Sequence, residues 1–393
     1  MKIAMVFDRL LWGGIERVGV IYANMMIKNG FDVDIIILEE NPESIIEEFD
    51  HRCNIIIKPF NNKYNSENFW PWVIENDYHG LETVAFSLKY LALKLLTPVL
   101  KIKKKIRSKE YDIAIAFSGH INDLSYVANK YVDAKKTVGW IHGAQYSYNM
   151  ISPGFFRLYK KFSNLICISD MCDVECEKWN KKFNINKKKI YNPCSIDTKS
   201  YDQHVVNELK DTYGDFCLMV GRVDQDKNQE LIIDAFYEIK NTFKLNKKFV
   251  IVGDGPKMQF LKDKIKKLNL EDTVYCVGTR NDVQNFYKAA HIYTHAAPVE
   301  GFGMVYVEAM SFGLPVITTD SIPGSREIFG NNEYGIIIQE NNSRQMAEAI
   351  VKLYSDDTLY ESLAIKGLSR CKMFDEKNIE KQLIEHLQYI VKS

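Results

Sequence analysis

Short apolar, β-branched runs alternate with helix-like stretches along almost the whole chain, and they fall into two series. In the first half, the runs predict strands at residues 2–7, 33–38, 112–117, 137–141 and 165–169. In the second half, they predict strands at residues 216–220, 247–252, 273–277, 291–295, 315–318 and 335–338. Strands that are apolar throughout and separated by helices are typical of parallel sheets covered on both faces. We therefore predict an α/β protein with two facing, doubly wound, Rossmann-like domains.

The chain length and one polar turn place the expected domain boundary. At 393 residues the chain is long for a single core, so two domains are expected. Residues 191–197 contain Pro193 among turn-forming neighbours, which end a strand before a polar stretch. We predict a first domain at 1–199, a second at 200–374, and a final helix at 375–393 that crosses back onto the first domain.

Composition argues against several classes of partner and site. Lys and Arg together number 51, as do Asp and Glu, so the whole-chain charge does not indicate a nucleic-acid partner. Asp8 and Arg9 come too early for a secretory signal peptide, and no run of about 18 apolar residues predicts a membrane-spanning helix. The eight cysteines are scattered, without the paired spacing of a zinc site. We expect reduced thiols, no bound metal and a cytoplasmic protein.

Residues 81–109 do not follow the alternation of strands and helices. An apolar stretch there leads into a basic run that includes Lys103, Lys104 and Lys105. That composition is typical of a helix that binds the surface of an anionic membrane, here the cytoplasmic face of an inner membrane. A core-facing helix with a solvated basic end has the same composition, and Pro98 interrupts the pattern. Both interpretations stay open.

Residues 298–310 place two carboxylates, Glu300 and Glu308, eight positions apart across a glycine-rich helix start. The helix is expected to begin at about Gly303, with Glu300 in the preceding loop and Glu308 one to two turns in. Gly301 and Gly303 let backbone N–H groups approach a ligand, and a helix N-terminus favours an anion. Such a site suits a nucleotide-sugar, which has a diphosphate in the middle and hydroxyl groups at both ends. The alternative is an ordinary amphipathic helix.

Three cations follow other strands of the second series. Arg222 and Lys227 lie just past the strand at 216–220, and open α/β sheets bind ligands at the carboxyl ends of their strands. These two side chains are candidates for clamping two phosphates. Arg280, in the loop after another strand, is a candidate for stacking on a base, although an ordinary loop explains it equally well. Residues 253–256 lack the third glycine of a dinucleotide loop and are interpreted as a turn.

The first half offers two further candidates. Gly13 and Gly14 follow the first strand and open a helix, so their backbone N–H groups are candidates for contact with a phosphate. His142 closes the strand at 137–141 and is therefore expected at the carboxyl edge of its sheet, where cleft residues lie.

Taken in order, these elements resemble the retaining glycosyltransferases of family 4, which have the GT-B fold: two facing Rossmann-like domains with a deep cleft between them. The matching pieces span almost the whole chain and are densest in its second half. They are Gly13-Gly14-x-Glu16, His142, Asn192-Pro193, Gly221-Arg222-x4-Lys227-Asn228, Gly253-Asp-Gly-Pro256, Glu300-Gly-Phe-Gly303 through Glu308-Ala309, Gly313-x-Pro315-Val-Ile317 and Gly324-x-x-Glu327. One departure is Gly143, because many relatives have Asp or Asn after the histidine.

The resemblance implies an acceptor-binding first domain and a nucleotide-sugar-binding second domain. It implies that Glu308 binds the ribose hydroxyls and that Arg222 and Lys227 neutralise the diphosphate leaving group. It also implies that Glu300 binds the hydroxyls of the donor sugar and that His142 contacts this sugar near the reacting carbon.

Backbone groups complete the implied site. Gly14 would approach the distal phosphate from the first domain. The N–H groups that would hold the sugar and this phosphate from the second domain are those of Phe302, Gly303, Met304 and Val305.

The function implied is a metal-independent, retaining transfer of a hexose or N-acetylhexosamine from a nucleoside-diphosphate sugar, with uridine diphosphate the commonest nucleotide among similar proteins. The acceptor would be a saccharide, lipid-linked, in the synthesis of a bacterial capsule, O-antigen or other envelope polysaccharide. No cofactor and no protein nucleophile are implied. Two alternatives stay open: a nucleotide-sugar epimerase or hydrolase on the same fold, and a non-catalytic nucleotide-sugar-binding protein.

Overall fold

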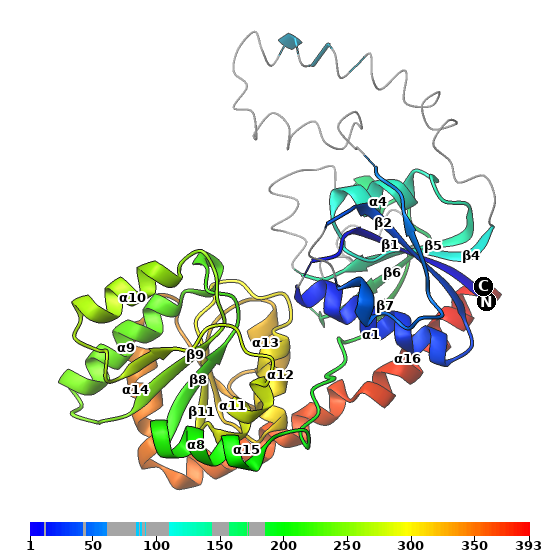
Figure 1. The fold of residues 1–393 in the computed structure, drawn as a ribbon. Helices are drawn as coiled ribbons and strands as arrows, with labels where there is room; N and C mark the ends of the chain where they lie inside the picture. The colour runs from blue at the N-terminus through cyan, green and yellow to red at the C-terminus, as the bar shows by residue number, and fades with distance from the viewer. Residues whose placement is uncertain are drawn as a thin grey trace. The chain divides into compact units, whose positions relative to one another are not determined.

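A computed structural model describes residues 1–11, 13–41, 45–60, 84–85, 87–88, 91, 110–143, 157–170, 172 and 185–393. It divides into two compact units (Figure 1). The N-terminal unit comprises Met1–Pro193 together with Lys377–Ser393, and the C-terminal unit comprises Cys194–Glu376.

The N-terminal unit is built on a seven-stranded parallel sheet with the order β3-β2-β1-β4-β5-β6-β7. The strands are β1 (Lys2–Arg9), β2 (Asp32–Glu39), β3 (Asn54–Ile57), β4 (Tyr111–Ala116), β5 (Ala134–Ile141), β6 (Asn164–Cys167) and β7 (Asn186–Lys189). The described helices are α1 (Gly14–Lys28), α4 (Ile121–Ala128), α16 (Glu376–Lys392) and a 3-10 turn at Ile46–Glu48. The strand order reverses between β1 and β4, which is where doubly wound sheets bind ligands.

The C-terminal unit repeats this plan with a six-stranded parallel sheet of order β10-β9-β8-β11-β12-β13. The strands are β8 (Phe216–Val220), β9 (Lys248–Val252), β10 (Val274–Cys276), β11 (Ile292–His295), β12 (Val316–Thr319) and β13 (Ile336–Ile338). The helices are α8 (Gln203–Tyr213), α9 (Gln229–Asn241), α10 (Met258–Lys267), α11 (Val283–Ala289), α12 (Met304–Ser311), α13 (Gly324–Phe329), α14 (Ser343–Ser355) and α15 (Asp357–Cys371), with 3-10 turns at Gln225–Lys227 and Lys372–Phe374. Here the order reverses between β8 and β11.

Two parallel, doubly wound sheets confirm the predicted fold class, and every predicted run forms a strand. The sequence analysis missed β3 and β7, and both lie at the edges of the N-terminal sheet. β7 reads Asn-Lys-Lys-Lys, which has no apolar signal, and lysines on an edge strand oppose further pairing. The other missed strand, β3, reads Asn-Ile-Ile-Ile, so its apolar signal is present in the sequence and was overlooked.

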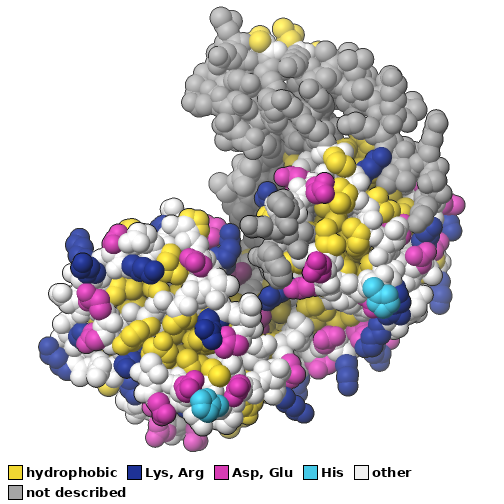
Figure 2. Space-filling view, viewed as in Figure 1, with side chains coloured by type: hydrophobic (Ala, Val, Ile, Leu, Met, Phe, Trp, Pro, Cys, Tyr) yellow, Lys and Arg dark blue, Asp and Glu magenta, His cyan; other side chains and the backbone are white. Residues whose placement is uncertain are grey.

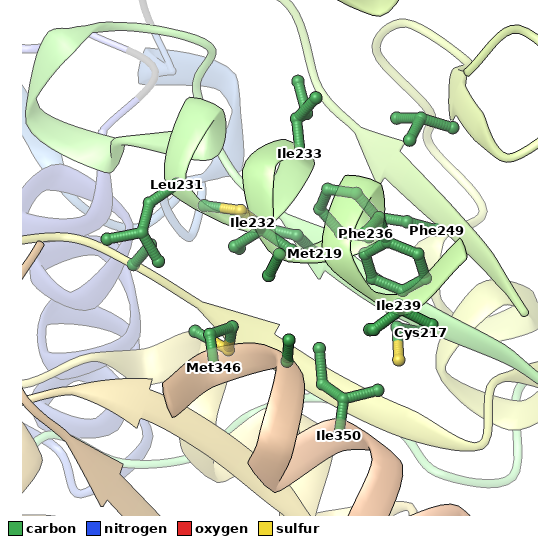
Figure 3. Close-up of a cluster of buried hydrophobic side chains, with 14 of the residues drawn as sticks. Cys217, Met219, Leu231, Ile232, Ile233, Phe236, Ile239, Phe249, Met346 and Ile350 are labelled. Atoms are coloured by element: carbon green, nitrogen blue, oxygen red, sulfur yellow. The ribbon is translucent and has the colours of Figure 1, made fainter. Parts of the chain in front are cut away.

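One face of the C-terminal sheet is covered by α9 and α14, whose apolar side chains pack together over the strands (Figure 3). Phe236 of α9 stacks on Phe249 of β9 with ring centroids 5.2 Å apart. Ile232, Ile239 and Met346 are also fully buried in this cluster. Each such side chain stabilises the fold by roughly 1.5–3 kcal/mol, so this layer holds the strands and their carboxyl ends in place.

The last helix, α16, packs on the N-terminal unit, beside α1 (Figure 1). Glu380 accepts hydrogen bonds from Lys28 Nζ at 2.9 Å and from Asn29 Nδ2 at 2.6 Å, where α1 ends. The buried face of α16 has helical spacing and consists of Ile379, Leu383, His386, Leu387 and Ile390.

Residues 81–109, for which the sequence leaves a membrane-surface helix and a core-facing helix open, lie outside the described residues except for 84–85, 87–88 and 91. Within the described part of the chain, no helix combines the length and the apolar character needed to cross a membrane. In the view of Figure 2, Lys and Arg side chains are interspersed with Asp and Glu over the C-terminal unit, in keeping with the balanced charge.

Candidate functional site

The loops that leave β8 and β11, together with helix α12 after the second loop, carry the predicted site residues of the C-terminal unit other than Arg280. These strands are neighbours and parallel, so their carboxyl ends open at the same edge of the sheet, where the strand order reverses. The 253–256 turn packs against the first of these loops, because a Cβ at Gly253 would overlap the carbonyl oxygen of Gly221. Gly253 is therefore needed for close backbone approach.

Lys227 and Glu300, which are 73 residues apart in the sequence, meet at this edge. Lys227 ends the 3-10 turn after β8, and Glu300 lies in the loop between β11 and α12. Lys227 Nζ donates a hydrogen bond to Glu300 Oε2 at 2.6 Å, and the two side chains are 20% and 19% exposed. The pair is thus partly shielded from water. The attraction between opposite charges is stronger at such a shielded position than in bulk solvent.

Arg222 lies on the same loop but makes a different ion pair. Its Nη2 is 2.9 Å from Asp224 Oδ2, and its side chain is 67% exposed. The backbone of the loop is held by Gln229, whose Nε2 donates to the carbonyl oxygen of Arg222 at 2.7 Å. The two predicted phosphate-binding cations therefore start from one loop, each with a carboxylate partner.

Glu308 lies on α12, which begins after Gly303 as the sequence predicts. The hydroxyl of Tyr287 on α11 donates to Glu308 Oε2 at 2.8 Å. Burial raises the pKa of Tyr287 well above its usual value, so the phenol keeps its proton and stays a donor. This bond fixes the orientation of the Glu308 carboxylate.

The predicted backbone donors surround the start of α12. Phe302 is buried, and its ring packs edge-on against Phe374 with centroids 5.4 Å apart, so its side chain serves the core. Gly303 is the N-cap residue with φ 84°, and Met304 and Val305 form the first turn of α12. The first N–H groups of a helix have no acceptor within the helix and are suited to an anion.

Arg280 follows β10 and is held by its own loop. Its Nε and Nη2 donate to the two carboxylate oxygens of Asp282 at 2.8 and 2.9 Å. Its guanidinium also lies over the ring of Phe286, 5.5 Å from the centroid.

In the N-terminal unit, Gly13 and Gly14 form the start of α1 directly after β1. His142 follows β5 and is buried, with Nε2 donating to the carbonyl oxygen of Phe117 at 2.6 Å. Burial lowers the pKa of His142 to about 4, so its ring is neutral at physiological pH. Because Nε2 is the donor, Nδ1 is the acceptor, and among the described residues it has no hydrogen-bond partner.

Residues 201–370, within the C-terminal unit, match the family model described as Glycosyl transferases group 1. The C-terminal unit therefore has the domain of this family. The match contains the loops that carry Arg222, Lys227 and Glu300 as well as the helix that carries Glu308. The protein is accordingly a glycosyltransferase of the group 1 family, known also as family 4.

Two curated relatives cover most of this group 1 glycosyltransferase. The N-acetylgalactosamine-N,N'-diacetylbacillosaminyl-diphospho-undecaprenol 4-alpha-N-acetylgalactosaminyltransferase of Campylobacter jejuni is 29% identical, covering 76% of this chain and 82% of the relative. The UDP-Gal:alpha-D-GlcNAc-diphosphoundecaprenol alpha-1,3-galactosyltransferase of Escherichia coli is 25% identical, covering 91% of this chain and 89% of the relative.

Solved structures of similar proteins share the fold. Anabaena HepE, in complex with UDP and glucose, has a TM-score of 0.72 at 20% identity and covers 99% of this chain and 100% of its own. WaaG, a glycosyltransferase involved in lipopolysaccharide biosynthesis, has a TM-score of 0.63 at 16% identity and covers 98% of this chain and 99% of its own. The group 1 glycosyltransferase therefore has the GT-B fold.

Sequence reasoning missed several polar residues of this glycosyltransferase that lie at the same sheet edges. In the N-terminal unit, Asp8 at the end of β1 accepts from Asn122 Nδ2 at 2.8 Å and lies 3.2 Å from His120 Nδ1. In the C-terminal unit, His295 ends β11 with its Nε2 4.0 Å from Glu300 Oε2. Each of them ends or closely follows a predicted strand, and that position is the signal that the sequence offers. Among the described residues, no cluster of three or more His, Cys, Asp and Glu side chains is arranged to hold a metal ion.

Proposed function

We propose that this glycosyltransferase moves a hexose or N-acetylhexosamine from a nucleoside-diphosphate sugar, a UDP-sugar, to a saccharide acceptor, with retention of configuration. The proposed acceptor is lipid-linked and belongs to a bacterial envelope polysaccharide such as a capsule or an O-antigen. The observation that carries the proposal is the Lys227–Glu300 pair at the β8/β11 switch point, beside the start of α12 that bears Glu308.

The pair combines the two chemistries that a sugar diphosphate requires. Breaking the bond between the anomeric carbon and the diphosphate leaves the electron pair on a phosphate oxygen. Lys227, Arg222 and the first N–H groups of α12 stabilise that negative charge where it develops. Glu300 accepts hydrogen bonds from hydroxyls of the transferred sugar, and Glu308 accepts from the ribose.

No protein base is needed in this proposal. The acceptor hydroxyl attacks the anomeric carbon from the face of the leaving group, which retains the configuration, and its proton passes to the departing phosphate oxygen. From the N-terminal unit, His142 offers a neutral imidazole with Nδ1 as acceptor for a sugar hydroxyl, and Gly14 offers a backbone N–H to the distal phosphate. Arg280 contributes to binding of the base.

The relatives support the choice of nucleotide and acceptor. The Escherichia coli relative is a UDP-Gal transferase that acts on a diphosphoundecaprenol-linked sugar, and the Campylobacter jejuni relative also acts on a diphospho-undecaprenol substrate. HepE binds UDP and glucose. We extend these features to this chain as part of the proposal.

Two measurements test the proposed reaction. The first is a thermal-shift comparison of UDP, UDP-glucose, UDP-galactose and their N-acetylated forms, because a bound donor raises the unfolding temperature by mass action. In the second, the protein is incubated with a crude membrane extract and a radiolabelled form of the donor identified in the first measurement, and the fraction that receives the label is determined. Label in the lipid fraction supports transfer. Label that stays water-soluble as free sugar or an altered nucleotide-sugar indicates a hydrolase or an epimerase, and label in unchanged donor indicates a binding protein.

The role of Lys227 gives a sharper prediction. Lys227→Ala should lower the transfer rate by a factor of about 10²–10³, the usual effect of removing one donor to a developing negative charge. The free energy of unfolding should fall by about 1.5–3 kcal/mol, the usual contribution of a hydrogen bond to a charged group, because the two side chains are only 20% and 19% exposed. The matched control is Lys240→Ala, which removes an ion pair with Asp272 of the same length, 2.6 Å, elsewhere in the unit. Wild-type transfer by the Lys227 variant would remove the leaving-group role.

A further inference from the structure

We propose that His295 is a positioning residue that orients the Glu300 carboxylate for recognition of the donor sugar's hydroxyls. This inference rests on the proposed function and adds a residue that neither the family motifs nor the charge pattern singles out. His295 is the last residue of β11 and lies five positions before Glu300.

The His295 ring is held on several sides. It is 1% exposed and packs edge-on against Tyr306 of α12, with ring centroids 5.2 Å apart and an interplanar angle of 85°. The ring centroid of Tyr293, on the same strand, lies 6.5 Å from that of His295. A side chain enclosed in this way keeps one rotamer, so its nitrogen atoms have fixed positions.

The hydrogen bonds of the ring determine its tautomer. The backbone N–H of Ala297 points at Nδ1 from 3.2 Å, and the Tyr306 hydroxyl lies 3.4 Å from the same atom. A backbone N–H is only a donor, so Nδ1 is an acceptor and the proton of the neutral ring lies on Nε2. Burial, and then the positive charge of Lys227, lowers the pKa of His295 well below its usual value, which keeps the ring neutral.

The protonated nitrogen is the one that faces Glu300. Nε2 is 4.0 Å from Glu300 Oε2, the oxygen that accepts from Lys227 Nζ at 2.6 Å. At 4.0 Å the contact is an attraction between the N–H dipole and the carboxylate charge rather than a direct hydrogen bond. Lys227 and His295 thus hold the same oxygen from two elements, and Oε1 is the oxygen that we assign to a sugar hydroxyl.

Two substitutions separate this role from core packing. His295→Asn keeps an acceptor near Nδ1 for the Ala297 N–H but removes the donor toward Glu300. His295→Gln places an amide N–H near the position of Nε2 and removes the acceptor. The measured quantity is the ratio of the affinity for a UDP-sugar to the affinity for UDP, obtained by titration calorimetry. The UDP-sugar is the one that most stabilises the wild-type protein in the thermal-shift comparison.

We expect His295→Asn to lower this ratio about tenfold, because a Glu300 carboxylate that is no longer oriented loses its hydrogen bond to a hydroxyl of the donor sugar, and a hydrogen bond to a charged group is worth about this much. The UDP affinity should stay at the wild-type value, which also reports an intact fold. His295→Gln should keep the ratio within about threefold of wild type. A ratio unchanged in the Asn variant, or lowered equally in both variants, would overturn the inference.

A double-mutant cycle tests whether His295 acts through Glu300. In a Glu300→Gln background the carboxylate charge is gone, so His295→Asn should change the ratio by less than about twofold. A further tenfold loss in that background would overturn the inference, because His295 would then act by another route. A wild-type protein that binds UDP but no UDP-sugar, or no nucleotide at all, would refute the proposed function and this inference with it. A functioning donor site with an unaffected Asn variant would refute the inference alone.

Discussion

Asp123 and His142 are buried, ionisable residues of the N-terminal unit whose pKa values are shifted in opposite directions. Burial raises the pKa of Asp123 to about 7, and Oδ1 of this carboxyl has no hydrogen-bond partner among the described residues. Burial lowers the pKa of His142 to about 4. Both residues are therefore neutral in the folded protein at mildly acidic pH, but their effects on stability have opposite signs.

The signs follow from which state binds more protons. Between pH 4 and 7 the folded protein keeps the Asp123 proton that the unfolded chain has lost, so this group makes stability fall as the pH rises. Between pH 4 and 6.5 the unfolded chain holds a proton on His142 that the folded protein lacks, so this group makes stability rise with pH. Each slope reaches at most about 1.4 kcal/mol per pH unit.

We predict that Asp123→Asn removes the contribution that makes the free energy of unfolding fall as the pH rises. The free energy of unfolding of the variant should rise more steeply than that of the wild type from pH 4 to 6.5 and should not fall from pH 6.5 to 7. Asparagine keeps the size of the side chain and an oxygen for the Gly119 N–H, which donates to Asp123 Oδ2 at 2.9 Å. Urea unfolding monitored by tryptophan fluorescence measures the stability of the N-terminal unit, because all five tryptophans precede residue 194. Parallel pH profiles for variant and wild type would contradict the prediction.

At the scale of elements, the start of α12 depends on one backbone conformation. Gly303 has φ 84°, and a Cβ there would overlap the buried ring of Tyr306. The hydroxyl of Tyr306 lies 3.0 Å from Thr318 Oγ1 and 3.0 Å from Ser321 Oγ, so the ring is not free to move away. The glycine that opens the helix is therefore a structural requirement of the predicted anion site.

We predict that Gly303→Ala destabilises the C-terminal unit by more than the cost of its backbone conformation. That cost alone is roughly 1–2 kcal/mol for a residue with a Cβ. Gly278→Ala is the matched control, because Gly278 has φ 74° and nothing lies within 4 Å of its Cβ position. Hydrogen exchange of the backbone amides of β8–β13 measures the stability of the C-terminal unit in both variants of the intact chain. Equal losses in the two variants would show that Tyr306 accommodates the extra methyl group.

At the scale of the whole molecule, the chain leaves the N-terminal unit at Pro193 and returns to it at Lys377. The returning helix, α16, buries Ile379, Leu383, Leu387 and Ile390. Burial of one such side chain contributes roughly 1.5–3 kcal/mol, whereas a whole domain is stable by only about 5–15 kcal/mol. The first half of the sequence therefore does not contain all of its own core.

We predict that a chain ending at residue 376 loses the cooperative unfolding transition of its N-terminal unit. The C-terminal unit should keep its stability, measured by hydrogen exchange of β8–β13, while tryptophan fluorescence reports the loss in the other unit. Glu380→Ala is the control, because removing the ion pair with the 66% exposed Lys28 should cost about 1 kcal/mol or less. A shortened chain with the wild-type fluorescence transition would show that α16 is dispensable.

The amino-acid sequence predicts the class of fold, the strands of both sheet interiors and the residue types of the proposed donor site. It does so because apolar periodicity and glycine–carboxylate spacing are local properties of the chain. The edge strand β7 was missed because an edge strand can be polar, whereas β3 has three consecutive isoleucines and its apolar run was overlooked. Three contacts become visible in the folded chain alone: Lys227 meets Glu300, Tyr287 donates to Glu308, and the N–H of His295 faces Glu300. These contacts join separate elements, and their geometry depends on how the parallel strands bring their carboxyl ends to one edge of the sheet.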